Sequence, residues 1–251
     1  MKLINHYDKI KKLYEQGSSM KEISQAISCG ESSVIQFLKR HNLFKDFRPV
    51  TKNYDYFENI DTKQKAYFLG FIAADGCVQH FHSTSCGLSI TIHTKDIAIL
   101  EKLKSELESE LTIKVLKTKN SLCRFQIASR KIYDDLVAKN IVPNKSLILD
   151  DFIQFIPEEL RTYAIVGYID GDGSVYRKKY SNEVTMRGTE KVLTSFKRHL
   201  SIMHRNLYLN KTYILSISNL NLAEIKNAYL DKDLFCLERK KAKFHGYIPE
   251  N

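Results

Sequence analysis

Two aspartates occupy the same place in two similar segments of the 251-residue sequence. Asp75 follows the run FLGFIAA, and Asp172 ends the run IVGYIDGD. Both runs read as apolar helices, so each carboxylate lies at a helix C-terminus, where the helix dipole disfavours negative charge. Gly76 and Gly173 are expected to end these helices in a left-handed conformation. Two carboxylates brought close together repel each other unless a cation bridges them. A hard divalent ion with oxygen ligands, Mg²⁺ or Mn²⁺, answers that need.

Small residues predict that the two helices do pack together. Gly70 and Ala74 are four residues apart in the first segment, and so are Gly167 and Gly171 in the second. This spacing exposes backbone along one helical face, which allows two helices to approach closely.

The two segments open an internal repeat that covers residues 61–251. Each copy continues with polar strands, a helix, an amphipathic strand and a lysine-bearing segment. In LSITIHT, for example, Leu88, Ile90 and Ile92 alternate with polar residues, the pattern of a half-buried strand. The sequence therefore predicts an α+β body of two pseudo-symmetric halves, residues 61–156 and 157–251.

The residues 68–76, FLGFIAADG, and 165–173, IVGYIDGDG, resemble the two LAGLIDADG motifs of single-chain homing endonucleases. The resemblance implies half-domains of the αββαββα type, whose sheets form a curved saddle over double-stranded DNA. It implies that Asp75 and Asp172 bind two or three metal ions, with the backbone carbonyls of Ala74 and Gly171 as further ligands. Ala73 replaces the first acid of the first motif; because that position does not bind metal in the family, no loss of chemistry is expected.

The resemblance also implies a catalytic lysine in each half. Lys145 follows Asp75 by 70 residues and Lys240 follows Asp172 by 68, and the repeat aligns them. A lysine-rich chain offers competitors near the second position, namely Arg239, Lys241 and Lys243, so Lys145 is the firmer assignment.

The expected reaction is metal-dependent hydrolysis of both strands of a long, pseudo-symmetric DNA target, with short 3′ overhangs and a monomeric enzyme. Phosphodiester hydrolysis needs an attacking water, a clamp on the phosphorus and stabilisation of the leaving group. Paired metal ions supply all three, so no serine or histidine nucleophile is required.

Charge supports an acidic partner. The chain has 39 Lys and Arg against 29 Asp and Glu, a net charge of +10, and a polar, cationic sheet face can enter a DNA groove. For any single strand, a merely solvated face is the better interpretation. The candidate DNA-binding residues of the two halves are Gln79, Ser89, Thr91, His93, Lys117, Lys119, Arg124, Gln126, Tyr176, Arg177, Lys178, Lys179, Thr185 and Arg187.

Residues 1–48 predict a separate, all-α unit, joined through a linker at residues 49–60. Ser19 and Glu22 form a capping box that opens a short helix with Ile23, Ala26 and Ile27 inward. The unit resembles a helix-turn-helix DNA-binding domain of the resolvase or homeodomain-like kind. A three-helix packing module that touches no DNA is the alternative. The outward face of its third helix offers Ser32, Ser33, Gln36, Lys39 and Arg40.

Two rival functions share this fold: an RNA-splicing maturase, and a transcription regulator that has lost catalysis. The intact pair of acids favours the nuclease over both. No apolar run is long enough to span a membrane, and the N-terminus lacks the apolar core of a secretion signal, so a cytoplasmic protein is expected. The five cysteines are scattered and form no CxxC pair, which disfavours a zinc ribbon or a disulfide framework.

Overall fold

The computed structural model describes residues 3–16, 18–43, 50–82, 85–117, 120–178, 181–203, 207–209, 211–218 and 222–244. The chain divides into two compact units, Met1–Arg48 and Pro49–Asn251, each with its own hydrophobic core. The second unit is called the body below.

The N-terminal unit is a three-helix module around Ile10, Val34 and Leu38. Its capping box is confirmed: the Ser19 hydroxyl accepts from the Glu22 N–H, and the Glu22 carboxylate accepts from the Ser19 N–H. The expectation that Ala26 faces inward is wrong, because Ala26 is exposed. A 3-10 turn, Leu3–His6, precedes the three helices, which are α1 (Tyr7–Glu15), α2 (Met20–Ala26) and α3 (Glu31–Arg40).

The body consists of two halves with the same order of elements, which confirms the predicted αββαββα pattern. Each half folds its four strands into an antiparallel sheet, in the orders β1-β2-β4-β3 and β5-β6-β8-β7. The first half contains α4 (Lys63–Asp75), β1 (Gly76–His82), β2 (Ser85–His93), α5 (Ile97–Glu106), β3 (Lys114–Val115), β4 (Leu122–Ala128) and α6 (Arg130–Val137). The second contains α7 (Arg161–Asp172), β5 (Ser174–Arg177), β6 (Asn182–Gly188), α8 (Glu190–His199), β7 (Leu207–Leu209), β8 (Thr212–Ser218), α9 (Ala223–Leu230) and the short α10 (Glu238–Lys241).

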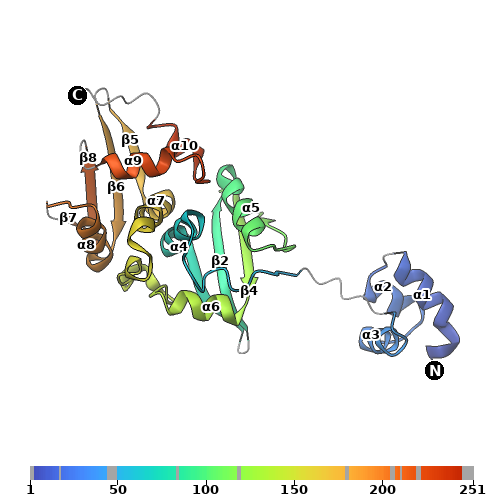
Figure 1. Ribbon diagram of the computed structural model, residues 1–251. Helices are drawn as coiled ribbons and strands as arrows, with labels where there is room; N and C mark the ends of the chain where they lie inside the picture. Colours follow the sequence, from blue (N-terminus) through green and yellow to red (C-terminus); the bar gives the residue numbers. More distant parts are fainter. Residues whose placement is uncertain are drawn as a thin grey trace. The chain divides into compact units, whose positions relative to one another are not determined.

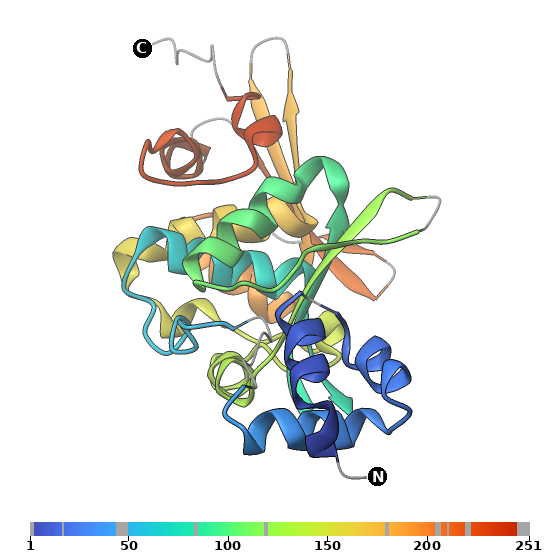
Figure 2. The same ribbon diagram turned by 90° about the vertical axis from the view of Figure 1, so that its right-hand side faces the viewer.

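Helices α4 and α7 lie side by side at the centre of the body, between the two sheets (Figures 1 and 2). Their backbones touch where glycine permits it. A Cβ atom on Gly70 would lie 1.8 Å from the Ala164 carbonyl oxygen, and one on Gly167 would lie 1.9 Å from the Tyr67 carbonyl oxygen. The helix pair predicted from the small-residue spacing is therefore present, and these glycines are required by close approach.

The inner faces of both sheets close the core around this helix pair. Leu88 and Ile90 on β2 and Phe125 and Ile127 on β4 are buried, as their alternation predicts. Leu215 and Ile217 do the same on β8. The outer faces carry the polar half of each alternation.

Residues 50–60 pack as part of the body, in contrast to the linker expected from the sequence. Thr51 pairs with Ser109 as an isolated antiparallel bridge, and their hydroxyls lie 2.8 Å apart. Tyr56, Phe57 and Ile60 are buried in the main core. These apolar residues follow neither a helical nor a strand period, so the sequence pattern did not reveal their burial.

The predicted helix ends also differ from the structure. Gly76 and Gly173 are extended, with φ of −74° and −95°, rather than left-handed. A Cβ on Gly76 would lie 2.6 Å from the Ile72 carbonyl oxygen, so glycine permits an immediate turn from helix into strand. Helix α5 follows Asp96, whose side chain makes no capping hydrogen bond, and ends at Glu106.

Within the described ranges, the structure contains no helix with the length and apolar character needed to cross a membrane.

Candidate active site and nucleic-acid interface

The two aspartates at the ends of α4 and α7 lie next to each other. A Cβ on Gly171, the residue before Asp172, would be 3.4 Å from the Asp75 carboxyl carbon. Burial and, second, the negative charge of Asp172 together raise the pKa of Asp75 to about 6. The pKa of Asp172 is also raised from its ordinary value, by burial, although part of its side chain faces solvent. Both carboxylates are therefore costly to ionise where they stand.

No hydrogen bond or ion pair among the described residues satisfies either carboxylate. The donor set at this point is oxygen only, which suits a hard divalent cation. The Gly171 carbonyl is the backbone oxygen available beside it, whereas the Ala74 carbonyl already accepts a hydrogen bond from Lys145. Among the described residues, no group of three or more His, Cys, Asp or Glu side chains could hold a metal ion by itself. A cation here would thus complete its coordination with water or a substrate oxygen.

A buried lysine donates hydrogen bonds to the C-terminal end of each of the helices α4 and α7. The Lys145 ammonium donates to the carbonyls of Ala74 and Gly76 at the end of α4. The Lys240 ammonium donates to the carbonyls of Ile169, Asp170 and Gly173 at the end of α7, at 2.5, 2.9 and 2.8 Å. Burial lowers the pKa of both lysines, that of Lys240 to about 8.

The three competitors of Lys240 do not bond to the end of α7. Arg239 forms a two-point ion pair with Asp96, at 2.8 Å for both bonds. Lys243 donates to the Val175 carbonyl in β5 at 2.6 Å, and Lys241 is partly exposed on α10. Lys240 is therefore the residue that matches Lys145 in position and contacts.

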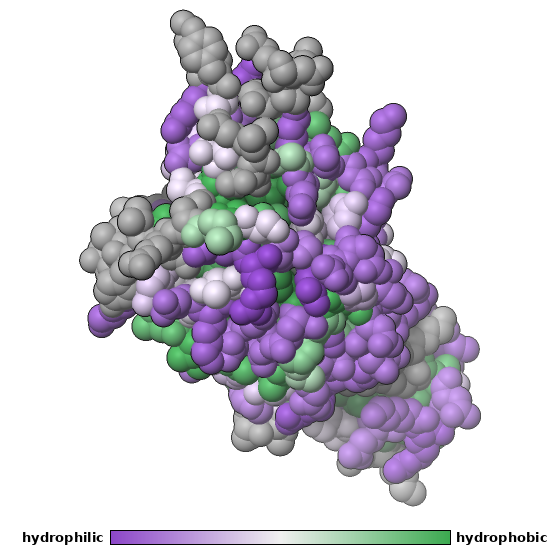
Figure 3. Space-filling model, turned by 60° about the vertical axis from the view of Figure 1, so that its left-hand side comes forward, coloured by the Kyte–Doolittle hydropathy of each residue, from purple (hydrophilic) through white to green (hydrophobic). Residues whose placement is uncertain are grey.

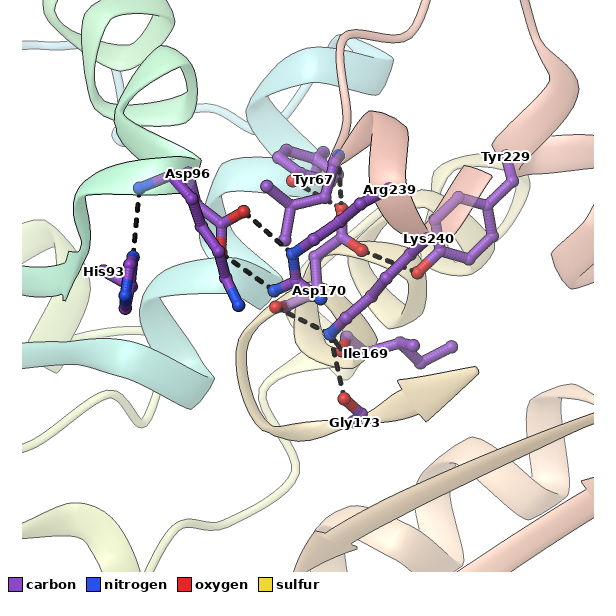
Figure 4. Close-up of polar contacts among 11 residues, drawn as sticks. Tyr67, His93, Asp96, Ile169, Asp170, Gly173, Tyr229, Arg239 and Lys240 are labelled. Atoms are coloured by element: carbon purple, nitrogen blue, oxygen red, sulfur yellow. Dashed lines mark hydrogen bonds and ion pairs between the residues drawn. The ribbon is translucent and has the colours of Figure 1, made fainter. Parts of the chain in front are cut away.

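Sequence reasoning missed a buried network centred on Asp170 (Figure 4). Its carboxylate accepts hydrogen bonds from the Tyr67 hydroxyl at 2.8 Å, the Tyr229 hydroxyl at 2.7 Å and the Leu237 N–H at 2.8 Å. Burial raises the pKa of Asp170 to about 6, against the opposing effects of the positive charge of Lys240 and of these three donors. A lone acid in an apolar helix was the only signal in the sequence.

No protein-family model matches the chain, and no curated protein matches it in sequence. Among solved structures, the LAGLIDADG meganuclease I-AabMI bound to uncleaved DNA is similar in fold, with 15% identity over 70% of this chain and 86% of that chain and a TM-score of 0.48. I-SmaMI, bound to an uncleaved DNA target in the presence of calcium ions, has 15% identity over 69% and 86% and a TM-score of 0.46. The I-LtrWI LAGLIDADG homing endonuclease bound to target DNA has 14% identity over 76% and 88% and a TM-score of 0.46.

The outer face of the first sheet collects most of the candidate DNA-binding residues of that half. The strand register places Ser89 beside Gln126 and Thr91 beside Arg124, on the face opposite to the core. Ser89 is nevertheless only 6% exposed, so its access is small. Lys114 pairs with Arg124 and adds a cation to this face that the sequence reading did not single out. The remaining candidates on this face or at its edge are Gln79, His93 and the exposed Lys117.

The outer face of the second sheet is less cationic than expected. This outer face carries Tyr176, Thr185 and Arg187. Arg177 pairs with Asn182 and lies on the other face of the sheet. Lys178 forms an ion pair with Glu183, whose carboxylate also accepts from the Ser216 hydroxyl. Hydrophilic residues cover most of the face of the molecule drawn in Figure 3. Lys119 and Lys179 lie outside the described residues.

The predicted contact residues of the N-terminal unit share the outward face of α3. Ser32, Ser33, Gln36, Lys39 and Arg40 are all exposed, while Val34, Phe37 and Leu38 between them are buried. The short connection from α2 to α3 includes Ser28 in a left-handed conformation, with φ of 52°. This arrangement exposes one face of α3 to solvent.

Proposed function

We propose that this protein is a divalent-metal-dependent endonuclease that cuts both strands of a specific double-stranded DNA site. The observation that carries the proposal is the matched pair of carboxylates, Asp75 and Asp172, at the ends of two helices packed through glycine, where no hydrogen bond or ion pair among the described residues satisfies either of them. A structural role would not require two costly carboxylates side by side. A pair of lysines, Lys145 and Lys240, stands in matched positions around them.

The aspartates, the lysines and the helix pair have different roles in the proposed reaction. Asp75 and Asp172 hold one or more Mg²⁺ or Mn²⁺ ions, up to three for the pair, with the Gly171 carbonyl as a further oxygen ligand. The bound ions would supply a polarised water and stabilise the charge that develops on the phosphate. Lys145 and Lys240 offset the negative charge of the carboxylates, and their ammonium groups bind the carbonyls at the ends of α4 and α7. The close helix pair keeps the two centres at a fixed separation, so that one bound DNA is cut on both strands to leave short 3′ overhangs.

The sheet faces supply a surface for the DNA backbone and grooves. Lys114 and Arg124 in the first half and Arg187 in the second are exposed cations on or beside these faces. We assign α3 of the N-terminal unit to a second contact with DNA, through its exposed polar and basic face.

The test is cleavage of a randomised double-stranded DNA library by the purified chain, in Mg²⁺ and in EDTA, with the products sequenced. The expected result is Mg²⁺-dependent cutting at one related set of sites. Asp75→Asn and Asp172→Asn should each abolish cutting and largely retain binding, because each removes a ligand of a shared site. Binding to DNA without cutting at any site would favour a regulator, and binding to structured RNA alone would favour a maturase.

A further inference from the structure

Asp170 lies at the meeting point of four parts of the body. It is 2% exposed and lies two residues before the end of α7. Its carboxylate binds Tyr67 of α4, Tyr229 of α9 and the N–H of Leu237 directly before α10. A buried carboxylate holds its three donors firmly, because hydrogen bonds to a charged group are stronger than neutral ones and are stronger still in the low-dielectric interior.

The bond to Leu237 continues directly to Lys240. The Leu237 carbonyl accepts from the Lys240 N–H at 2.9 Å, so Leu237 is bound to Asp170 through its N–H and to the backbone of Lys240 through its carbonyl. Helix α10 has four residues, too few to be stable alone. Its place therefore depends on such anchors.

A second anchor on α10 is more exposed. Arg239 pairs with Asp96, but its side chain is 44% exposed. Water and salt screen the Arg239 side of this pair, whereas Asp96 is 11% exposed and the two-point geometry retains part of the attraction. The Asp170–Leu237 bond is buried and therefore shielded from water and salt; the exposed Arg239–Asp96 pair is seen in Figure 4.

The first half lacks this device. Ala73 stands where the second half has Asp170, and a methyl group accepts no hydrogen bond. The segment after Lys145 is instead anchored from the other half, where the Thr189 hydroxyl donates to the Leu149 carbonyl at 2.5 Å. The two lysines are therefore held by different means, although their contacts with the helix ends match.

The geometry points to Asp170 as a positioning residue that fixes Lys240, but not Lys145, against the paired carboxylates. Its effect on DNA cutting rests on the proposed function, whereas its effect on Lys240 does not. Loss of Asp170 should free one lysine and spare the other. In an enzyme that cuts two strands, it should slow one strand more than the other.

The first experiment measures lysine reactivity without DNA. The full chain is treated with limiting acetic anhydride, and acetylation at each lysine is followed by mass spectrometry. In the wild type, Lys145 and Lys240 are both protected by burial. In Asp170→Ala, acetylation of Lys240 should rise about tenfold or more, because a buried hydrogen bond to a charged group is lost. Lys145 should stay protected, and Asp170→Asn, which keeps an acceptor oxygen, should remain close to wild type.

A second pair of variants tests the same bond if Asp170→Ala does not fold. Leu237 has φ of −66°, the value that proline imposes, so Leu237→Pro removes the N–H donor without changing the backbone angle. Leu237→Ala keeps the donor and is the matched control for the lost side chain. Lys240 should become reactive in Leu237→Pro and stay protected in Leu237→Ala.

Equal protection of Lys240 in the folded Ala and Pro variants would overturn the assignment. So would a parallel rise at Lys145 and Lys240, which would mean that Asp170 only stabilises the body as a whole. If the wild type cuts a selected plasmid site, the Asp170→Ala protein should accumulate nicked circles before linear product. If the wild type cuts no DNA, the proposed function fails, and the reactivity data alone decide the role of Asp170.

Discussion

At the residue scale, the site brings together two carboxylates and two lysines whose charged forms are disfavoured by their surroundings. The carboxylates of Asp75 and Asp172 have raised pKa values, and the lysines around them have lowered ones. Burial is the first cause for all four. The charged forms of these carboxylates and lysines stabilise one another by attraction, and a bound cation would further offset the negative charge of the two carboxylates.

Replacing Asp75 by Asn should therefore stabilise the protein when divalent ions are absent. The folded pKa of about 6 lies above the ordinary 3.8, so the folded state holds a proton that the unfolded state releases as pH rises. This penalty is absent below pH 3.8, grows between 3.8 and about 6, and is complete above that. In EDTA at pH 7.5, Asp75→Asn should unfold with a free energy about 1–3 kcal/mol higher than wild type. At pH 4 the two should nearly coincide.

Thermal melts at both pH values, with and without Mg²⁺, measure this difference. Mg²⁺ should raise the melting temperature of the wild type by mass action and leave that of the variant nearly unchanged. A variant that melts below the wild type at pH 7.5 in EDTA would show that the carboxylate stabilises the apo-protein, contrary to this account.

At the element scale, the central feature is the contact between α4 and α7, which tolerates no side chain at two points. Gly70→Ala and Gly167→Ala place a methyl group within 2 Å of a backbone oxygen on the facing helix. Each should lower the free energy of unfolding of the body by about 1–3 kcal/mol or more, because the helices must separate. Denaturant unfolding measures the shift. Gly30→Ala is the control, since its Cβ would meet no atom closer than 3.9 Å and it lies in the other unit. A body transition unchanged in the Gly70 and Gly167 variants would contradict the close packing.

The elements that the sequence predicted are those whose signal is local and repeated. The alternation in β2 and β4, the capping box at Ser19 and the doubled helix with its glycines each lie within a few residues. The buried segment of Tyr56 and Phe57 was missed because it packs near the end of helix α5 and the residues after it, about fifty residues away in the sequence. Asp170 was missed for the same reason, since its three donors come from distant elements. Physical contacts across the fold leave no periodic pattern in the sequence.

At the scale of the whole molecule, the cationic sheet faces should govern how binding depends on salt. Each phosphate contact contributes roughly 0.9 to the slope of log affinity against log salt. The triple variant Lys114→Gln, Arg124→Gln and Arg187→Gln should flatten that slope by up to about three such units. A matched control neutralises three cations on helices, Lys102, Lys131 and Lys191. Filter binding of one DNA duplex over a range of salt concentrations compares the two proteins, and equal slopes would mean that the sheet faces are only solvated surface.

The division into two units predicts that recognition and chemistry can be separated. Both aspartates, both lysines and both sheets belong to the body, whose core does not include residues of the N-terminal unit. The truncation should remove residues 1–48 and no more, because Thr51 and the buried residues after it are part of the body. A chain that starts at Pro49 should therefore fold and cleave.

That truncated protein should bind its DNA more weakly and less selectively than the full chain. A tethered second module raises affinity through effective concentration without contributing to the reaction. Footprints of the two proteins on the same duplex test this directly. The full-length footprint should extend further on one side of the cleavage site only, since each chain has one such unit.

The variant Gln36→Ala with Arg40→Ala, both on the exposed face of α3, should shorten the full-length footprint to that of the truncated protein while the N-terminal unit stays folded. Identical footprints for the full and truncated chains would mean that the unit does not contact this DNA. A truncated protein that folds but cannot cut at any concentration would mean that the unit takes part in the reaction itself.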